Sequence, residues 1–373
     1  MNTKTSFLKK PVVQSLMASL ISIAVGLLIG YIVLLMINPD GAGEAIRTIL
    51  LNFLTRHRKA TLLKTLGNTL VKMAPLLMCA LSVCFCYKVK LFNIGAAGQY
   101  VAGAGAALYC ALGLQMNWFV SLMAGMLAGA LLGTITGLLK AYRSVNEVIS
   151  GIMLNWITLY LVNTILTREG IKDSASPYTL SIPRTQPSAM IPDLGLSQFF
   201  TNNKTVTIAI PLSIITAIIL WVVLNKRKVG YELKATGYNT DAAKYAGMKE
   251  RKNIIMTLAV GGALAGLGAG FMFLSGYMQW SVTQTTVPSM GFNGIAATFL
   301  GGLNPIGTIF SSFFIQNITD GGALIDRTIY PTQISDLISS IIIYTCGFSG
   351  FFQTMLQQRA LKKKESNSKE GGK

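Results

Sequence analysis

Charged residues are scarce in this sequence. They make up 12% of its 373 residues, against the ~25% that is usual in soluble domains. Apolar runs close to the ~20 residues needed to cross a bilayer recur along the whole chain. The mean hydropathy is +0.52. The composition excludes an ordinary soluble domain and predicts an all-α polytopic membrane protein.

Residues that usually carry chemistry are also few. The five cysteines lie in apolar segments, and no histidine or carboxylate follows Cys84 and Cys86 at ligand spacing. We interpret them as small core residues rather than metal ligands or disulfide partners. His57 is the only histidine and lies in a basic loop. Without a nucleophile–base pair, a metal cluster or a G-x-x-x-x-G-K-[ST] phosphate loop, the sequence predicts neither an enzyme nor an ATPase.

Carboxylates are scarce within the apolar segments. Glu147 lies at the first turn of one expected helix, and Asp320, Asp326 and Asp336 lie in or beside the last expected external loop. An ion-coupled carrier usually needs a carboxylate near the bilayer midplane. The sequence therefore disfavours an ion-coupled secondary transporter, which stays as the alternative from another class.

Positive charge is abundant, with a net charge of +18. The Lys and Arg residues lie between apolar runs and are not interleaved with aromatics, which fits membrane orientation and argues against nucleic-acid binding. Ten spans are expected. They cover residues 12–37, 69–88, 91–113, 117–140, 145–167, 206–224, 254–278, 289–303, 305–318 and 332–352.

Charge also sets the expected topology. A cytoplasmic N-terminal segment (1–11) precedes a transmembrane domain (12–352), and a disordered basic tail (353–373) lies in the cytoplasm. The basic loop 225–253 is then cytoplasmic, and the proline-containing loop 168–205 is external.

Three segments leave alternatives open. Residues 12–37 are too long for a signal peptide and are expected to be a retained first helix. This topology places the basic loop 38–68 on the external side of the membrane. Its stretch EAIRTILLNFL is expected to form an amphipathic helix at the membrane interface. The pair of spans within 289–318 is either two tilted helices or a re-entrant hairpin.

Glycines recur at intervals of four in two of the expected spans. Such spacing places them on one helix face, where they allow the close backbone approach on which helix association in lipid depends. We expect these faces to pack within the chain rather than between two chains. The helix-packing residues are Gly125, Gly129, Gly133 and Gly137 in one span and Gly262, Gly266 and Gly270 in the other.

One glycine-rich phrase occurs twice, as LFNIGAAGQY (91–100) and as GFNGIAATFL (291–300). Each copy holds a Phe-Asn pair ahead of small residues. We interpret the copies as matching helix starts in two pseudo-symmetric halves, as transporters often have. Asn93 and Asn293 are then positioned either to contact a polar solute or to hydrogen-bond a neighbouring helix.

The cytoplasmic stretch GYELKATGYNTDAAKYAGM (230–248) is helix-prone around 241–246. Asn239 or Thr240 is the expected N-cap. Its alanines would give the helix a surface of small residues, which is typical of a docking element. A solvated amphipathic linker is the alternative.

Four stretches carry a resemblance to a known family: KVKLFNIGAAGQYVAGAGAA (88–107), SVNEVISGIMLNWI (144–157), VGYELKATGYNTDAAKYAGM (229–248) and GFNGIAATFLGGLNP (291–305). In this order and spacing, they resemble the membrane permease subunits of ATP-binding-cassette importers. The branch is the one that serves simple sugars, nucleosides and branched-chain amino acids. The chain is most similar to the nucleoside permeases that work with lipoprotein receptors of the basic-membrane-protein type.

The resemblance implies a type II importer fold in a bacterial cell membrane, with both termini cytoplasmic. It implies a permease for nucleosides and favours purine nucleosides among them. A ribose- or galactose-type sugar permease is the alternative. The implied partners are a cytoplasmic ATPase, a second and different permease chain, membrane lipid, and an external binding lipoprotein that delivers the solute. ATP and Mg²⁺ would be bound by the ATPase, so this chain needs no cofactor of its own.

The resemblance also implies functional residues. The ATPase-coupling residues would be Gly237, Asn239, Asp241, Ala242, Ala243, Tyr245, Ala246 and Gly247. Asn93, Glu147 and Asn155 match polar positions that recur in the nucleoside subgroup. Our own hypothesis is a translocation path in which aromatic rings offer stacking surfaces and amides offer hydrogen bonds: Phe92, Asn93, Gln99, Asn155, Trp156, Phe292 and Asn293. Helix packing is the alternative role for the amides. Ala97 stands where nucleoside permeases often have an acidic residue. This difference leaves the exact identity of the solute undetermined.

Overall fold

The computed structural model describes residues 11–56 and 58–358. Residues 1–10, His57 and residues 359–373, which include most of the two expected cytoplasmic ends, lie outside the described residues. Within the described ranges the secondary structure is helical, apart from isolated bridges between Lys172 and Thr179 and between Tyr178 and Ser281. The predicted all-α fold is confirmed.

Each expected span corresponds to a helix. They are α2 (Pro11–Ile37), α4 (Lys59–Tyr87), α5 (Ala96–Leu108) with a π-helical turn (Tyr109–Gly113), α6 (Trp118–Arg143), α7 (Glu147–Leu166), α10 (Ala209–Lys226), α13 (Glu250–Phe273), α14 (Met290–Leu300), α15 (Pro305–Gly322) and α16 (Thr332–Cys346). Seven helical stretches of the described residues are long and apolar enough to cross a membrane: six within α2, α4, α6, α7, α10 and α13, and one at Asp336–Gln358. The chain is thus a multi-pass membrane protein, in which α5, α14 and α15 are shorter or less apolar.

Shorter helices fill the connections. They are α3 (Pro39–Leu51), α8 (Ile182–Thr185), α9 (Leu196–Phe199), α11 (Lys228–Tyr238) and α12 (Thr240–Tyr245). The expected loop 38–68 is therefore mostly helical, because α3 and the first turns of α4 occupy it. The amphipathic helix expected there corresponds to α3.

Asparagine side chains start several helices. The Asn117 side-chain oxygen accepts a hydrogen bond from the Val120 N–H at 3.0 Å and caps α6. Asn146 caps α7 in the same way through the Val148 N–H at 2.8 Å. Such caps satisfy backbone donors that a helix cannot satisfy internally. The short α6–α7 connection is also closed by an ion pair, since Lys140 Nζ lies 2.7 Å from Glu147 Oε2.

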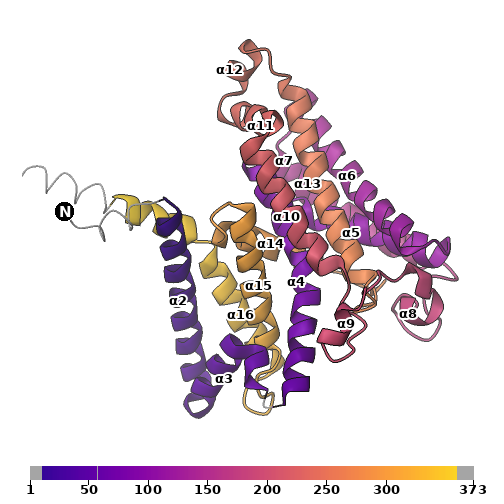
Figure 1. Ribbon diagram of the computed structural model, residues 1–373, viewed down its shortest axis with the longest axis vertical. Helices are drawn as coiled ribbons and strands as arrows, with labels where there is room; N and C mark the ends of the chain where they lie inside the picture. Colours follow the sequence, from indigo (N-terminus) through magenta and orange to yellow (C-terminus); the bar gives the residue numbers. More distant parts are fainter. Residues whose placement is uncertain (1–10, 57, 359–373) are drawn as a thin grey trace, which may run out of the picture. The chain divides into compact units, whose positions relative to one another are not determined.

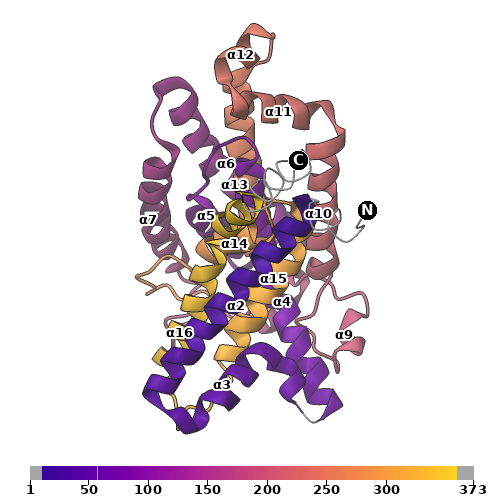
Figure 2. The same ribbon diagram turned by 90° about the vertical axis from the view of Figure 1, so that its left-hand side faces the viewer.

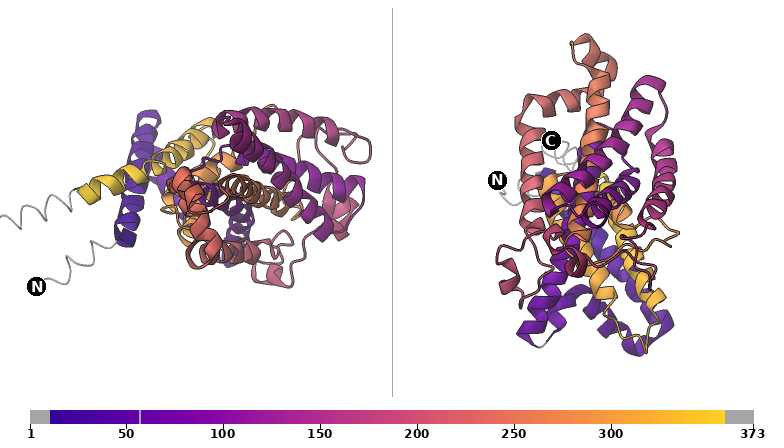
Figure 3. Two further views of the ribbon diagram at one scale, coloured as in Figure 1. Left: turned by 90° about the horizontal axis from the view of Figure 1, so that it is seen from above. Right: turned by 90° about the vertical axis from the view of Figure 1, so that its right-hand side faces the viewer.

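Two compact units make up the chain. One contains residues 1–52, 299–302 and 317–373. In it, α2 and α16 cross, as seen in the left view of Figure 3, and Gly26 of α2 lies against Ile342 and Thr345 of α16. We refer to it as the α2–α16 unit.

The larger unit contains residues 53–298 and 303–316, and it holds the features described below. Its helix α13 packs against α4, α5 and α6, while α7 and α10 lie on opposite sides of it (Figure 2). Helix α4 is buried continuously from Met73 to Cys86, which is typical of a helix that is apolar on all faces. We refer to it as the α13 unit.

The two glycine stripes lie against each other in the α13 unit. A methyl group added to Gly129 of α6 would clash with the Gly262 carbonyl oxygen of α13 and would lie 2.9 Å from the Gly266 Cα. One added to Gly137 would lie 2.9 Å from the Ile255 Cα. Backbone therefore contacts backbone along α6 and α13, and the glycines of these two helices pack within the chain.

We expect Gly266→Leu to disrupt this contact. Any side chain at Gly266 would clash with the Gly125 carbonyl oxygen, and such overpacking costs about 1–3 kcal/mol. Thermal melting of the purified chain in detergent measures the effect as a lower melting temperature. The control is Gly43→Leu, because Gly43 of α3 has nothing within 4 Å of an added methyl group. Equal melting temperatures for the two variants would contradict the assignment.

Candidate functional site

Two of the expected path residues hydrogen-bond each other at the start of α5. Asn93 Nδ2 donates to Gln99 Oε1 at 2.8 Å, and Gln99 Nε2 donates back to Asn93 Oδ1 at 3.2 Å. Asn93 also donates to Ser82 Oγ of α4 at 3.0 Å. Both amides are buried, at 2% and 1% exposure. They form an internal polar cluster that ties α5 to α4.

Asn155 of α7 completes the start of α5 from a neighbouring helix. Its Oδ1 accepts a hydrogen bond from the Gly98 N–H at 2.7 Å, and its Nδ2 donates to the Ile94 carbonyl at 3.1 Å. The N-cap position of α5 is Gly95, which makes no side-chain cap of its own. Gly98 permits this approach, because a methyl group there would lie 2.7 Å from the Asn155 Cα. In the structure Asn155 is thus a cap supplied by another helix.

The remaining expected path residues lie apart from this cluster. Trp156 is 43% exposed and stacks on Tyr160 along the outward face of α7. Phe92 is half-buried against the edge of Tyr87, and Phe292 is 42% exposed. The structure brings together the amides of Asn93, Gln99 and Asn155, but not the aromatic rings.

The two copies of the repeated phrase contact each other within the α13 unit. Gly291 lies against the backbone of Ala97, so closely that an added methyl group would be 2.5 Å from the Ala97 Cα. Their local structures differ, however. Asn93 lies in the turn before α5, whereas Asn293 lies in the first turn of α14 and is partly exposed.

Helices α11 and α12 form a hairpin, the coupling hairpin, at one end of the α13 unit (Figure 1). Asn239, one of the two expected N-caps, caps α12 through the Ala242 N–H at 2.9 Å. Asn253 Nδ2 of α13 donates to Thr236 Oγ1 of α11 at 2.8 Å. Gly237 lies against the backbone of Val89 in the α4–α5 link. The hairpin is thus fixed both to α13 and to the turn that leads into α5.

The tip of the hairpin is largely exposed. Asp241, Ala242, Ala246 and Gly247 are exposed, and the exposed fraction of Tyr245 is 94%. Ala243 differs from the expectation of an open alanine face, because it is 3% exposed and faces inward. The small-residue surface of α12 therefore consists of Ala242 and Ala246 beside Tyr245.

Basic side chains surround the foot of the hairpin. Lys90 lies over the Tyr238 ring at 5.6 Å. Burial, together with the positive charge of Lys88, lowers the pKa of Lys234. Positive charge is therefore concentrated at the hairpin end of the α13 unit.

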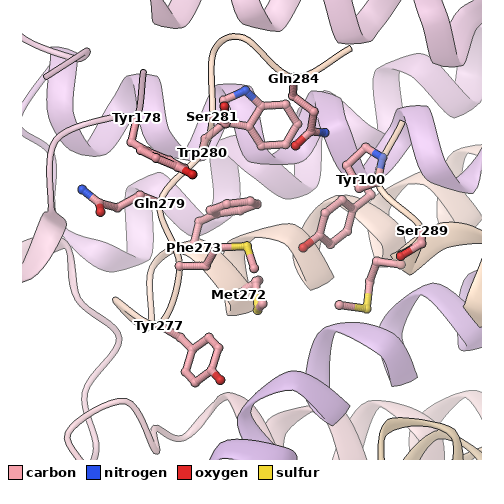
Figure 4. A pocket seen from close by; sticks show the side chains of 13 residues that line it. Tyr100, Tyr178, Met272, Phe273, Tyr277, Gln279, Trp280, Ser281, Gln284 and Ser289 are labelled. Carbon is pink, nitrogen blue, oxygen red and sulfur yellow. The ribbon is translucent and has the colours of Figure 1, made fainter. Parts of the chain in front are cut away.

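A cavity of about 630 Å³ opens at the other end of α13. Figure 4 shows aromatic rings and amide groups around it. Within residues 11–56 and 58–358, its lining contains no charged residue and none of the expected path residues. The lining residues are Tyr100, Tyr178, Met272, Phe273, Tyr277, Met278, Gln279, Trp280, Ser281, Gln284, Pro288, Ser289 and Met290. We refer to this space as the aromatic cavity.

Hydrogen bonds between distant segments hold the wall of the aromatic cavity. The Thr179 N–H donates to the Trp280 carbonyl at 2.9 Å, which joins segment 168–205 to the segment after α13. Trp280 Nε1 donates to Asn163 Oδ1 of α7 at 2.9 Å. Asn163 Nδ2 in turn donates to the Gln284 carbonyl at 2.8 Å. Asn163 thus fixes both Trp280 and the following loop, although sequence reasoning did not select it.

The chain thus combines helices that are long and apolar enough to cross a membrane with an exposed hairpin before α13 and a cavity at the end of α13. This combination is typical of a membrane transport protein. The chain belongs to the family described as branched-chain amino acid transport system, permease component, which it matches over residues 65–346. It is therefore a permease component, as the four motifs indicated, and a multi-pass protein of the cell membrane.

Individual relatives are transport proteins as well. The chain is 32% identical to the nucleoside ABC transporter permease NupB of Lactococcus lactis over the full length of both. It is 29% identical to the guanosine ABC transporter permease NupP of Bacillus subtilis over 81% of this chain and 85% of the relative. The glucose ABC transporter permease TsgB13 of Haloferax volcanii is 25% identical over 77% of each chain. No solved structure matches the chain.

We expect Asn155→Ala to destabilise the protein by about 1–3 kcal/mol, because it leaves the buried Gly98 N–H and the partly buried Ile94 carbonyl without this partner. Thermal melting in detergent measures the loss. Asn117→Ala makes the same chemical change at an exposed cap, where water replaces the lost acceptor, and should cost less. A larger loss for Asn117→Ala than for Asn155→Ala would refute the structural role of Asn155.

Proposed function

We propose that the chain is the membrane-spanning permease subunit of an ATP-driven importer for nucleosides. The observation that carries this proposal is the similarity to the nucleoside permease NupB along the whole of both chains. The guanosine permease NupP adds support over most of the chain and points to purine nucleosides.

The aromatic cavity supports the same solute class. Flat aromatic faces with a few amide groups suit a neutral aromatic solute, whereas a sugar needs denser hydrogen bonding. The five aromatic residues of the lining and its lack of charge fit a nucleoside. A sugar permease is the second candidate, because the glucose permease TsgB13 is also similar to this chain.

The driving energy would come from partner chains. A cytoplasmic ATPase would bind ATP and Mg²⁺ and dock on α12, with Tyr245 and Ala246 at the contact. The proposed orientation places the coupling hairpin in the cytoplasm and segment 168–205 outside. There an external binding lipoprotein would deliver the solute to this chain and a second permease subunit. The positive charge at the foot of the hairpin supports this orientation.

We expect deletion of this chain to abolish uptake of labelled guanosine and to leave uptake of labelled ribose unchanged. Cells with and without the chain are compared, and the chain is returned on a plasmid as the control. Loss of ribose uptake alone would replace the nucleoside assignment with the sugar alternative. It would leave membership of the permease family intact.

We expect Tyr245→Asp to lower guanosine uptake at least about tenfold. An exposed tyrosine at the centre of an interface often carries much of its binding energy, and a charge there opposes docking. Because Tyr245 is 94% exposed, the melting temperature of the chain should not change. Co-purification with the ATPase, compared with the wild type, measures the docking itself.

Phe199→Asp is the matched control, since Phe199 of α9 is 73% exposed and α9 lies in segment 168–205, away from the hairpin. It should retain ATPase co-purification. Full co-purification and uptake with Tyr245→Asp would exclude the tip of the hairpin as the docking site.

A further inference from the structure

We infer that the aromatic cavity is a binding site for the transported nucleoside within this chain, and that the Tyr100 hydroxyl hydrogen-bonds the solute there. The inference rests on the proposed function and assigns that function a place and a contacting group.

Tyr100 is the first observation. It belongs to α5, lines the cavity and is 3% exposed. Its hydroxyl has no hydrogen-bond partner among the residues that the structure describes. The hydroxyl is open to the cavity rather than sealed within the protein. A solute in the cavity would supply the missing partner.

The aromatic wall is the second observation. Phe273 contacts Tyr100 on one side, with ring centroids 6.3 Å apart, and Trp280 on the other, with ring centroids 5.6 Å apart. Figure 4 shows this group of rings beside the cavity. Phe273 and Trp280 are 3% and 2% exposed and form the base of the wall, whereas Tyr178, at 46% exposure, and the partly buried Tyr277 present accessible rings. A nucleobase can stack on these two rings, and a simple sugar cannot use them in this way.

Polar groups at the rim complement the edge of a base. Gln279 Nε2 donates to the Thr179 carbonyl at 2.7 Å, and Gln284 Nε2 donates to the Thr286 carbonyl at 2.9 Å. Each amide then presents its side-chain oxygen as an acceptor. With the Tyr100 hydroxyl as a donor, the cavity matches the mixture of N–H groups and acceptors on a purine nucleoside.

The lack of charge in the cavity further restricts the class of ligand that it can bind. An amino acid would bring a carboxylate and an ammonium group, and a nucleotide would bring a phosphate. Burying such a group without a charged or strongly dipolar partner is costly. Among the residues that the structure describes, no charged side chain lines the cavity. Lys72 lies over the Tyr277 ring at 5.6 Å without lining the cavity. The site is thus suited to an uncharged nucleoside rather than to a nucleotide or an amino acid.

The wall is also preformed. Trp280 is 2% exposed and is held through its indole N–H by Asn163. A cavity whose walls are already fixed spends less of its binding free energy on ordering side chains. Asn163 therefore holds the buried base of the wall in place without touching the solute.

The test uses the complete transporter in membrane vesicles and measures the initial rate of labelled guanosine uptake. Tyr100→Phe should lower the rate about 3- to 10-fold, which corresponds to loss of one hydrogen bond to a neutral group. Tyr109→Phe removes a hydroxyl from the adjoining π-helical turn, does not alter the lining, and should keep the wild-type rate. Gln279→Ala is a second variant at an exposed position and should also lower the rate, so the test remains decisive if Tyr100→Phe folds poorly.

Photolabelling locates the base directly. Irradiation of the complete transporter with 8-azidoguanosine should label the segment 272–290 of this chain, and excess guanosine should suppress the label. Labelling confined to another segment, or wild-type uptake rates in both the Tyr100→Phe and Gln279→Ala variants, would overturn the inference while leaving nucleoside import intact. Absence of guanosine uptake by the wild-type transporter would instead overturn the proposed function, and the inference with it.

Discussion

Close contact between the backbones of α6 and α13 is the constraint on which the α13 unit depends. Gly266 of α13 meets the backbones of Gly103 on α5 and of Gly125 and Gly129 on α6, so three helices converge where none carries a side chain. In lipid no hydrophobic effect drives helices together, and van der Waals contact at short range must hold them. One larger residue at this point separates all three helices.

This contact gives α13 a fixed position, and its two ends adjoin the coupling hairpin and the aromatic cavity. Asn253, near the start of the helix, holds the coupling hairpin through Thr236. Met272 and Phe273, at its end, line the aromatic cavity. A helix of 24 residues is about 36 Å long. Movement of the hairpin would therefore reach the cavity as displacement of a packed helix rather than through flexing of a loop.

Local features of this structure could be predicted from the sequence, and features made by distant residues could not. The four-residue glycine spacing and the Asn239 cap depend on neighbours within one or two helical turns. The aromatic cavity instead joins Tyr100 and Tyr178 to residues after Met272, which become neighbours through the hydrogen bonds of Thr179 and Trp280. The prediction that Ala243 belongs to the exposed surface of α12 was wrong. A helix of six residues is too short for its periodicity to show which face is buried.

Polar residues at the start of α5 show what residue type alone does not reveal about a candidate path. Asn93 and Gln99 were selected because an amide can bind a polar solute, yet in the folded chain each is bonded to the other. Tyr100 follows Gln99 directly and has an unpaired hydroxyl that faces the cavity. A sequence shows where hydrogen-bonding groups are, but not whether the fold already satisfies them. A group that is open to the cavity and has hydrogen-bonding capacity to spare can bind a solute without breaking an internal hydrogen bond. This criterion favours Tyr100 over Asn93, whose two amide hydrogens are already used and which does not line the cavity.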